Sequence, residues 1–384
     1  MKFRSESEKS KKIMIVCGES SGDLHGSYLV KELFKSEPEA DIYGIGGKKM
    51  ISQGFSAFLK SEDLAFMGIT DVLKNLGAIS SAKKTAEFIL KNKKPDLLIL
   101  IDYPGFNLKL AEYAKKLKIK VLYYISPKIW AWNMKRIYKI KAFTDHTALI
   151  FPFEKEIYDN YEVPATFVGN PLLDYDIPRR KKKPFSQIQK APVIGILPGS
   201  RSDEILRLLP VLLQTAFDVS NDFNEPEFIV SFACKSQKEF FYKEIDKYKD
   251  FINIKIETES VYNIFEKADF LIAASGTVTL EAAIAEIPMI IVYKVSPVTY
   301  HAGKFAVKTS FIGLASIIAG REVVPELVQS DAEPENIRNY LLYYLKDEDI
   351  YNKTVKDLKE VKSALGSKGV SKRTAGLAID MAER

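Results

Sequence analysis

The feature that most constrains the fold is an alternation of short, fully apolar runs with longer amphipathic stretches. Residues 13–17 (IMIVC), 97–101 (LLILI) and 193–197 (VIGIL) are examples of the apolar runs. Strands without polar alternation are typical of parallel sheets that helices cover on both faces. The chain has 384 residues, more than one core usually supports, so we expect two such domains. The predicted class is α/β, with two Rossmann-like doubly wound domains facing a cleft.

A run of positive charge divides the chain. Five consecutive cations, 179–183, lie between Pro178 and Pro184, and such a run is typical of an exposed linker. We therefore predict an N-terminal domain at 1–175, a linker at 176–190 and a C-terminal domain at 191–345. The remainder, 346–384, is predicted to form helices that pack back on the N-terminal domain or on a partner subunit.

Composition narrows the function classes. The chain is 46% hydrophobic and 28% charged with a net charge of +6, which fits a globular protein and permits contact with phosphates or an anionic membrane surface. Cys17 and Cys234 lie far apart, and His25, His146 and His301 are scattered, so we expect no disulfide scaffold and no metal site. No apolar run approaches the 18 residues of a membrane span, so any membrane contact is predicted to be peripheral.

The first apolar runs of the N-terminal half end in polar residues. Residues 13–17 lead into GESSGDLHG, in which Ser20 and Asp23 match a capping box and the glycines allow a ligand to approach the backbone. Residues 97–101 end on an acid, Asp102, before Tyr103 and Pro104. A carboxylate there can act as a general base or cap the turn that follows, and the residues alone leave both interpretations open.

Two strand ends of the C-terminal half favour a nucleotide diphosphate. In LPGSRSDEI a buried strand is followed by Ser200 and Arg201, and helix N–H groups beside a guanidinium suit phosphate, although a plain surface arginine is the alternative. In FLIAASGTVTLEAAI the strand ends at Ser275, Gly276 and Thr277. A capping box would need Ser or Thr at Val278, so Glu281 is free to accept ribose hydroxyls. Neither loop is a P-loop, because GKS and GKT are absent.

Nine stretches in order, from Ile13 to Gln329, resemble the lipid A disaccharide synthases, which are GT-B glycosyltransferases. They are GESSGDLHG, YGIGGKKM, FMGITDVL, LLILIDYPGFN, YYISPKIWAW with Arg136, FPFEKEIY, LPGSR, ASGTVTLEAA and IAGREVVPELVQ. The resemblance implies an inverting, metal-independent transfer of 2,3-diacylglucosamine from its UDP donor to the 6-hydroxyl of 2,3-diacylglucosamine 1-phosphate. It also implies a location on the cytoplasmic face of the inner membrane of Gram-negative bacteria, with no cofactor.

The resemblance assigns roles to named residues. It makes Asp102 the candidate general base. The expected substrate contacts in the cleft are Glu19, Ser21, Gly22, Asp23, Asn107, Trp132 and Arg136. The expected donor contacts are Ser200, Arg201, Ser275, Gly276, Thr277, Glu281 and Ser316. Two departures limit this transfer: Asn170 stands where the family has a histidine, and Ser316 where it has an asparagine.

A wide apolar face on residues 64–76 suggests how the chain reaches lipid substrates. Phe66, Met67, Ile69 and Val72 are predicted to contact acyl chains and the membrane, with a helix packed on the sheet as the alternative. No nucleic-acid partner is expected, and a homodimer is possible on this sequence. The rival functions are another GT-B enzyme on a UDP-sugar, such as a UDP-N-acetylglucosamine 2-epimerase or the lipid II glycosyltransferase, and a non-catalytic nucleotide-sugar or acyl-lipid binding protein.

Overall fold

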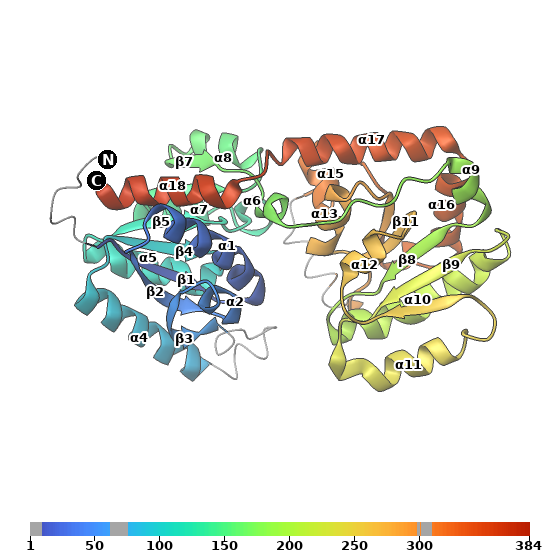
Figure 1. Ribbon diagram of the computed structural model, residues 1–384, viewed down its shortest axis with the longest axis horizontal. Coiled ribbons are helices and arrows are strands. Elements are labelled where there is room, and N and C mark those ends of the chain that lie inside the picture. Colours follow the sequence, from blue (N-terminus) through green and yellow to red (C-terminus); the bar gives the residue numbers. More distant parts are fainter. Residues whose placement is uncertain (1–9, 62–75, 298–299, 301–308) are drawn as a thin grey trace. The chain divides into compact units, whose positions relative to one another are not determined.

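Two compact units make up the chain in the computed structural model, which describes residues 10–61, 76–297, 300 and 309–384. Unit 1 comprises Met1–Asp174 and Leu365–Arg384, and unit 2 comprises Tyr175–Ala364. Each unit contains one parallel sheet flanked by helices (Figure 1). The predicted α/β class with two Rossmann-like sheets is therefore confirmed.

The seven-stranded sheet of unit 1 has the order β3-β2-β1-β4-β5-β6-β7, and all its pairs are parallel. The strands are β1 (Lys12–Cys17), β2 (Asp41–Gly46), β3 (Ser56–Lys60), β4 (Leu97–Ile101), β5 (Lys120–Tyr124), β6 (His146–Leu149) and β7 (Ala165–Phe167). All five residues of β4 are fully buried. Such burial contributes about 1.5 to 3 kcal/mol for each large aliphatic side chain, which explains the unbroken apolar run.

Helices cover both faces of this sheet. One group contains α1 (Ser20–Ser36), α2 (Lys48–Ile51) and α18 (Val370–Glu383), with α1 packed against the other two. The other contains α4 (Leu76–Lys93), α5 (Pro104–Lys116) and α7 (Arg136–Phe143), in which α5 packs against both neighbours. Right-handed crossovers on either side of β1 and β4 place the two groups on opposite faces. The shorter helices are α6 (Ile129–Trp132), α8 (Glu154–Asn160) and η2 (Pro171–Asp174).

The six-stranded sheet of unit 2 has the order β10-β9-β8-β11-β12-β13 and is again parallel throughout. Its strands are β8 (Val193–Leu197), β9 (Glu227–Ser231), β10 (Ile254–Glu257), β11 (Phe270–Ala274), β12 (Met289–Tyr293) and β13 (Glu326–Val328). The described helices are α9 (Phe185–Lys190), α10 (Ser202–Ser220), η3 (Lys235–Gln237), α11 (Lys238–Asp246), α12 (Val261–Phe265), α13 (Thr277–Ile284), α15 (Leu314–Ala319), η4 (Gln329–Asp331), α16 (Pro334–Lys346) and α17 (Glu348–Ala364).

The run of five cations packs partly on unit 2. The guanidinium of Arg180 lies 5.3 Å from the ring centroid of Tyr351, and Lys183 pairs with the buried carboxylate of Asp269 at 2.7 Å. Residues 346–384 divide between the units, because α17 belongs to unit 2 whereas α18 packs against α1 in unit 1.

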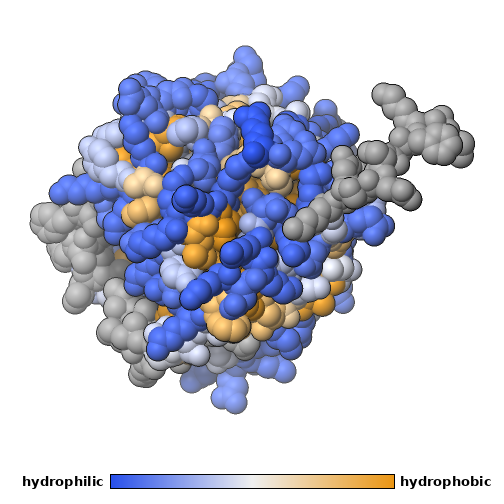
Figure 2. All heavy atoms as spheres, turned by 90° about the vertical axis from the view of Figure 1, so that its left-hand side faces the viewer, coloured by the Kyte–Doolittle hydropathy of each residue, from blue (hydrophilic) through white to orange (hydrophobic). Residues whose placement is uncertain are grey.

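Hydrophilic residues predominate on the side of the molecule drawn in Figure 2, and hydrophobic ones show there in small separate areas. Among the described residues, no helix is both long enough and apolar enough to cross a membrane.

Candidate active site

The sheet of unit 1 has its topological switch point between β1 and β4, which are neighbours although two strands separate them in sequence. Ligands of open α/β sheets bind at the carboxyl ends of the strands at such a point. Glu19 follows β1 by two residues, and Asp102 follows β4 directly. The topology thus brings these two predicted site residues to one edge of the sheet.

The backbone at Asp102 is strained and firmly held. Asp102 and Tyr103 both have φ of +47°, a left-handed conformation that costs non-glycine residues about 1 to 3 kcal/mol each. The Asp102 carbonyl oxygen accepts hydrogen bonds from the Tyr123 hydroxyl at 2.6 Å and the Asn107 amide at 2.8 Å, and its N–H donates to Tyr124 O at 3.1 Å. Strain that the surroundings hold in this way is typical of functional sites.

The environment makes the Asp102 carboxylate a better base than a free aspartate. Burial raises its pKa to about 6, and the negative charge of Glu19 adds to the increase. Lys128 and the backbone N–H of Tyr103 act in the opposite direction. A carboxylate with this pKa is ionised near neutral pH and still has useful proton affinity.

Other residues expected at the acceptor site lie on the helices that follow β4 and β5. The side chain of Asn107 is fully buried and holds the Asp102 loop. Burial and the negative charge of Asp102 raise the pKa of Tyr123, the tyrosine that donates to Asp102 O. The charge of Arg136, the first residue of α7, opposes this increase. Trp132 is the last residue of α6 and is 56% exposed. Lys128 is an exposed cation of this edge that the sequence analysis missed, although it lies within the YYISPKIWAW stretch.

The capping box predicted for GESSGDLHG is wrong. Helix α1 begins at Ser20 with Glu19 at its N-cap position, and no side chain caps it. Instead, the buried Asp23 carboxylate accepts the N–H groups of Gly47, Lys49 and Met50 at 2.8, 3.0 and 3.1 Å. Asp23 therefore caps α2 and fixes the loop after β2.

The remaining residues of this motif have different surroundings. Glu19 and Ser21 are exposed, whereas Gly22 is buried against the end of β1. A Cβ atom at Gly22 would lie 3.0 Å from the Cβ of Cys17. Gly22 thus permits close packing of α1 on the strand, and the exposed members of the motif are Glu19, Ser20 and Ser21.

The predicted histidine replacement has a structural role. Asn170 is buried, and its side-chain oxygen accepts the N–H of Leu172 at 3.1 Å in η2. Its own N–H donates to Leu365 O at 2.9 Å. Asn170 therefore ties η2 to the segment that leads into α18.

The second switch point lies in unit 2, between β8 and β11. After β8, the Glu204 carboxylate accepts the N–H groups of Ser200 and Arg201 at 3.0 and 3.2 Å and binds the Arg201 guanidinium at 2.7 Å. These two N–H groups, expected to meet a phosphate, are thus already occupied. The Arg201 side chain is 63% exposed, so its remaining donors are accessible to a ligand.

The loop after β11 leaves its helix N-terminus open. Gly276 is the N-cap of α13, and no side chain caps this helix. Gly276 and Thr277 are exposed and Ser275 is half-buried, with open space at the position of a Gly276 Cβ. Burial raises the pKa of Glu281, one turn into α13. An uncapped helix N-terminus is suited to an anion.

Ser316 does not present its hydroxyl to a ligand in this structure. The residue is fully buried in α15, and its Oγ accepts the N–H of Val323 at 3.3 Å. Its predicted contact with the donor is therefore not supported, because the hydroxyl is used to fix the segment before β13.

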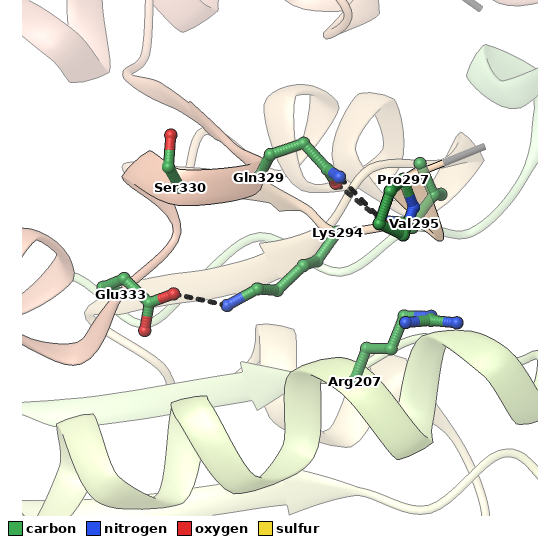
Figure 3. Close-up of a pocket in the computed structure, with 7 residues that line it drawn as sticks. All are labelled: Arg207, Lys294, Val295, Pro297, Gln329, Ser330 and Glu333. Carbon is green, nitrogen blue, oxygen red and sulfur yellow. Dashed lines mark hydrogen bonds and ion pairs between the residues drawn. The ribbon is translucent and has the colours of Figure 1, made fainter. Parts of the chain in front are cut away.

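Figure 3 shows a pocket of about 330 Å³ at the carboxyl ends of β12 and β13, beside α10. It is lined by Arg207, Lys294, Val295, Pro297, Gln329, Ser330 and Glu333. Gln329 has φ of +54°, and its side chain binds both the N–H and the carbonyl of Val295, at 2.7 and 3.0 Å. Lys294 pairs with Glu333 at 2.6 Å, whereas Arg207 has no ion pair within the described part of the chain.

This pocket belongs to the same edge as Arg201. Burial and the charge of Glu204 raise the pKa of Tyr293, the residue directly before Lys294, and the charge of Arg201 opposes this increase. None of the pocket residues was predicted from sequence to be a site residue, although Gln329 ends the IAGREVVPELVQ stretch. The sequence shows the motif that contains Gln329, but nothing in the motif indicates a role for this residue.

Some predictions cannot be placed. Phe66, Met67, Ile69 and Val72 lie outside the described residues, as does His301. Within residues 10–61, 76–297, 300 and 309–384, no group of three or more His, Cys, Asp or Glu side chains could hold a metal ion.

Solved structures with the same architecture define the class. The UDP-GlcNAc 2-epimerase from Neisseria meningitidis superposes with a TM-score of 0.62 at 12% identity, covering 96% of this chain and 100% of its own. The calicheamicin glycosyltransferase CalG4 superposes with a TM-score of 0.63 at 13% identity, covering 98% of this chain and 99% of CalG4. The fold is thus that of GT-B glycosyltransferases and the epimerases that share it.

Similarity in sequence identifies the family to which the chain belongs within this class. The family described as lipid-A-disaccharide synthetase matches residues 13–379. The lipid-A-disaccharide synthase of Geobacter sulfurreducens is 40% identical over 97% of each chain, and that of Coxiella burnetii is 38% identical over 88% of this chain and 90% of its own. The chain belongs to the lipid A disaccharide synthase family and is a glycosyltransferase, which confirms the resemblance.

Proposed function

We propose that the chain transfers 2,3-diacylglucosamine from UDP-2,3-diacylglucosamine to the 6-hydroxyl of 2,3-diacylglucosamine 1-phosphate. The products are the β-1,6-linked disaccharide 1-phosphate and UDP. The observation that carries this proposal is Asp102, a carboxylate with a raised pKa on a strained loop at the β1/β4 switch point. Family membership supports it independently.

In the proposed mechanism Asp102 is the general base. As the acceptor 6-oxygen attacks the anomeric carbon, its proton passes to the Asp102 carboxylate. The new carbon–oxygen bond forms on the face opposite to UDP, and the bond to the diphosphate oxygen breaks, so the configuration inverts. One base and one departing diphosphate suffice for such a displacement. Glu19, Ser21, Trp132 and Arg136 are the proposed acceptor contacts, while Asn107 positions the base.

Unit 2 is proposed to bind the donor. The Arg201 guanidinium offers a fixed fork of donors that suits the diphosphate. The uncapped N-terminus of α13, with Ser275 and Thr277, offers further N–H and hydroxyl donors, and Glu281 accepts the ribose hydroxyls. Arg207 and Lys294 extend the positive charge along the same edge of the sheet, into the pocket of Figure 3.

The substrates set the expected location. Both carry acyl chains, so we propose that the chain works in the cytoplasm and associates peripherally with the inner membrane. The net charge of +6 supports attraction to anionic lipid.

Mass spectrometry of products from purified protein tests the function. With both defined substrates, we expect the disaccharide 1-phosphate and an equal amount of UDP. Conversion of the UDP-sugar without acceptor into its C2 epimer would support the epimerase alternative instead. Binding without any turnover would support a non-catalytic protein.

A further inference from the structure

The two helical faces of the unit 1 sheet differ sharply in charge. Helices α4, α5 and α7 together carry ten lysine or arginine residues and two glutamates. On the opposite face, α1, α2 and α18 together carry six basic and four acidic residues. The helices of one face therefore have a net charge of +8, and those of the other face a net charge of +2. Since the whole chain has a net charge of +6, the excess positive charge is concentrated on the α4–α5–α7 face.

Much of this charge is not neutralised within the fold. Five lysines of this face have acidic partners at 2.5 to 3.8 Å, namely Lys83, Lys93, Lys115, Lys116 and Lys141. Five other exposed lysines of this face make no ion pair with any described residue. They are Lys84, Lys91, Lys109, Lys135 and Lys139. Unpaired lysines spread over three adjacent helices produce a broad positive potential rather than a single binding point.

Large aromatic side chains lie among these lysines. Phe88 is 67% exposed, and its position on α4, four residues after Lys84 and three before Lys91, places all three on one stripe of the helix. Tyr138 on α7 is 61% exposed. Transfer of an exposed phenylalanine side chain from water into an apolar medium is favourable, and flanking lysines then remain at the anionic boundary.

We propose that the α4–α5–α7 face docks on the surface of a lipid bilayer that contains anionic lipid. Scattered positive charge with an exposed phenylalanine between lysines suits the interface of a bilayer, which accepts aromatic rings below a plane of negative headgroups. A nucleic acid would use the lysines and leave Phe88 in water. The proposal deepens the proposed function, because it names the surface by which the chain meets acylated substrates.

Vesicle binding tests this face without any substrate. The probes are vesicles of phosphatidylcholine alone and vesicles in which phosphatidylglycerol replaces part of it. We expect clear binding only to the second kind. The triple variant Lys84→Gln, Lys91→Gln, Lys109→Gln should bind them about 100-fold more weakly, given the usual attraction of each lysine near such a surface.

A matched control removes the same charge elsewhere. Lys353, Lys356 and Lys359 are exposed on α17 of unit 2 and have no ion pair with a described residue. Their triple change to glutamine should leave vesicle binding nearly unchanged. An equal loss in this control, unchanged binding of the α4–α5 variant, or no preference for anionic vesicles would each overturn the proposal.

Variants of Phe88 provide a second test of vesicle binding, and this test does not depend on a change of charge. Phe88→Trp should show a blue shift of its fluorescence when anionic vesicles are added, relative to wild type with Trp130 and Trp132 only. Phe88→Ser should weaken binding several-fold, whereas Phe251→Ser, at a 72% exposed phenylalanine of unit 2, should not. An unshifted fluorescence of Phe88→Trp together with full binding by Phe88→Ser would contradict insertion at this face.

The reaction and the docking surface can fail separately. UDP affinity of the α4–α5 triple variant is expected to equal that of wild type, because none of its changes lies in unit 2. If vesicle binding follows the prediction but no disaccharide forms, the proposed function is wrong and the docking surface stands. If the disaccharide forms but the variant binds vesicles normally, only the docking proposal is wrong.

Discussion

The topological switch points of the two units share the same strand topology but carry different side chains. After β4 in unit 1, burial raises the pKa of the Asp102 carboxyl, and three hydrogen bonds fix its backbone. After β8 in unit 2, the Arg201 guanidinium is largely exposed, and Glu204 satisfies the loop around it. A buried carboxylate on a rigid loop is suited to proton transfer, whereas an exposed guanidinium is suited to recognition of phosphate. We therefore propose that unit 1 supplies the base and that unit 2 binds the donor.

The largest expected effect breaks the chemistry of unit 1. Asp102→Asn keeps the shape of the side chain and removes the base, so kcat should fall by about 10²- to 10⁴-fold. Steady-state turnover with both substrates measures it. A loss of less than about tenfold would reject Asp102 as the base.

A smaller effect is expected from Arg201→Ala in unit 2. A charge-assisted contact with phosphate is worth about 1.5 to 3 kcal/mol, so UDP affinity should weaken roughly 10- to 150-fold. Calorimetry with UDP measures the loss, with Lys356→Ala on α17 as the control for an exposed cation of the same unit. Unchanged UDP affinity would remove Arg201 from the donor site.

The pH dependence of the reaction sharpens the assignment of Asp102. Because the base must be ionised, kcat/KM should fall about tenfold per pH unit below its pKa of about 6. The stability of the folded state should change with pH in the opposite direction to kcat/KM. Folding raises this pKa from 3.8 to about 6, so the stability associated with the protonated form is lost as pH rises through that interval.

Asp102→Asn should therefore remove the contribution of this carboxyl group to the pH dependence of the free energy of unfolding. Relative to wild type, the variant should become more stable between about pH 4 and pH 6 and keep that advantage at higher pH. Thermal melting of both proteins across this range measures the difference. A relative loss of stability by the variant over the same interval would contradict a raised pKa.

The smallest effect tests the role of Glu204. Its carboxylate competes with a diphosphate for the Arg201 guanidinium, and such exposed pairs contribute about 0.2 to 1 kcal/mol. Glu204→Gln should tighten UDP binding by about two- to fivefold and lower the melting temperature slightly through the weaker cap. Weaker UDP binding by this variant would show that Glu204 supports the ligand instead of competing with it.

Local sequence predicted the parts of the fold that depend on local pattern. The apolar runs became β1, β4 and β8, and the acid that ends the second run lies at the switch point. Long-range partners were not predictable from spacing. The amides that bind Asp23 lie 24 to 27 residues away, and Ser316 is buried by contacts that only the folded unit reveals.

Two contacts that depend on backbone conformation were also not predictable from residue spacing. Gln329 adopts a left-handed φ and clamps Val295, 34 residues earlier in the chain, which no periodicity indicates. The bond from Glu204 back to Ser200 and Arg201 lies within five residues, yet an arginine at the N-cap concealed it, since capping boxes are recognised by serine or threonine there.

UDP calorimetry on Asp102→Asn tests the division of labour between the units most directly. We predict that this variant binds UDP within about twofold of wild type, because the changed side chain belongs to unit 1 and donor binding is proposed for unit 2. The same preparation of the variant should have lost turnover. A fall in UDP affinity as large as that of Arg201→Ala would contradict this division of labour.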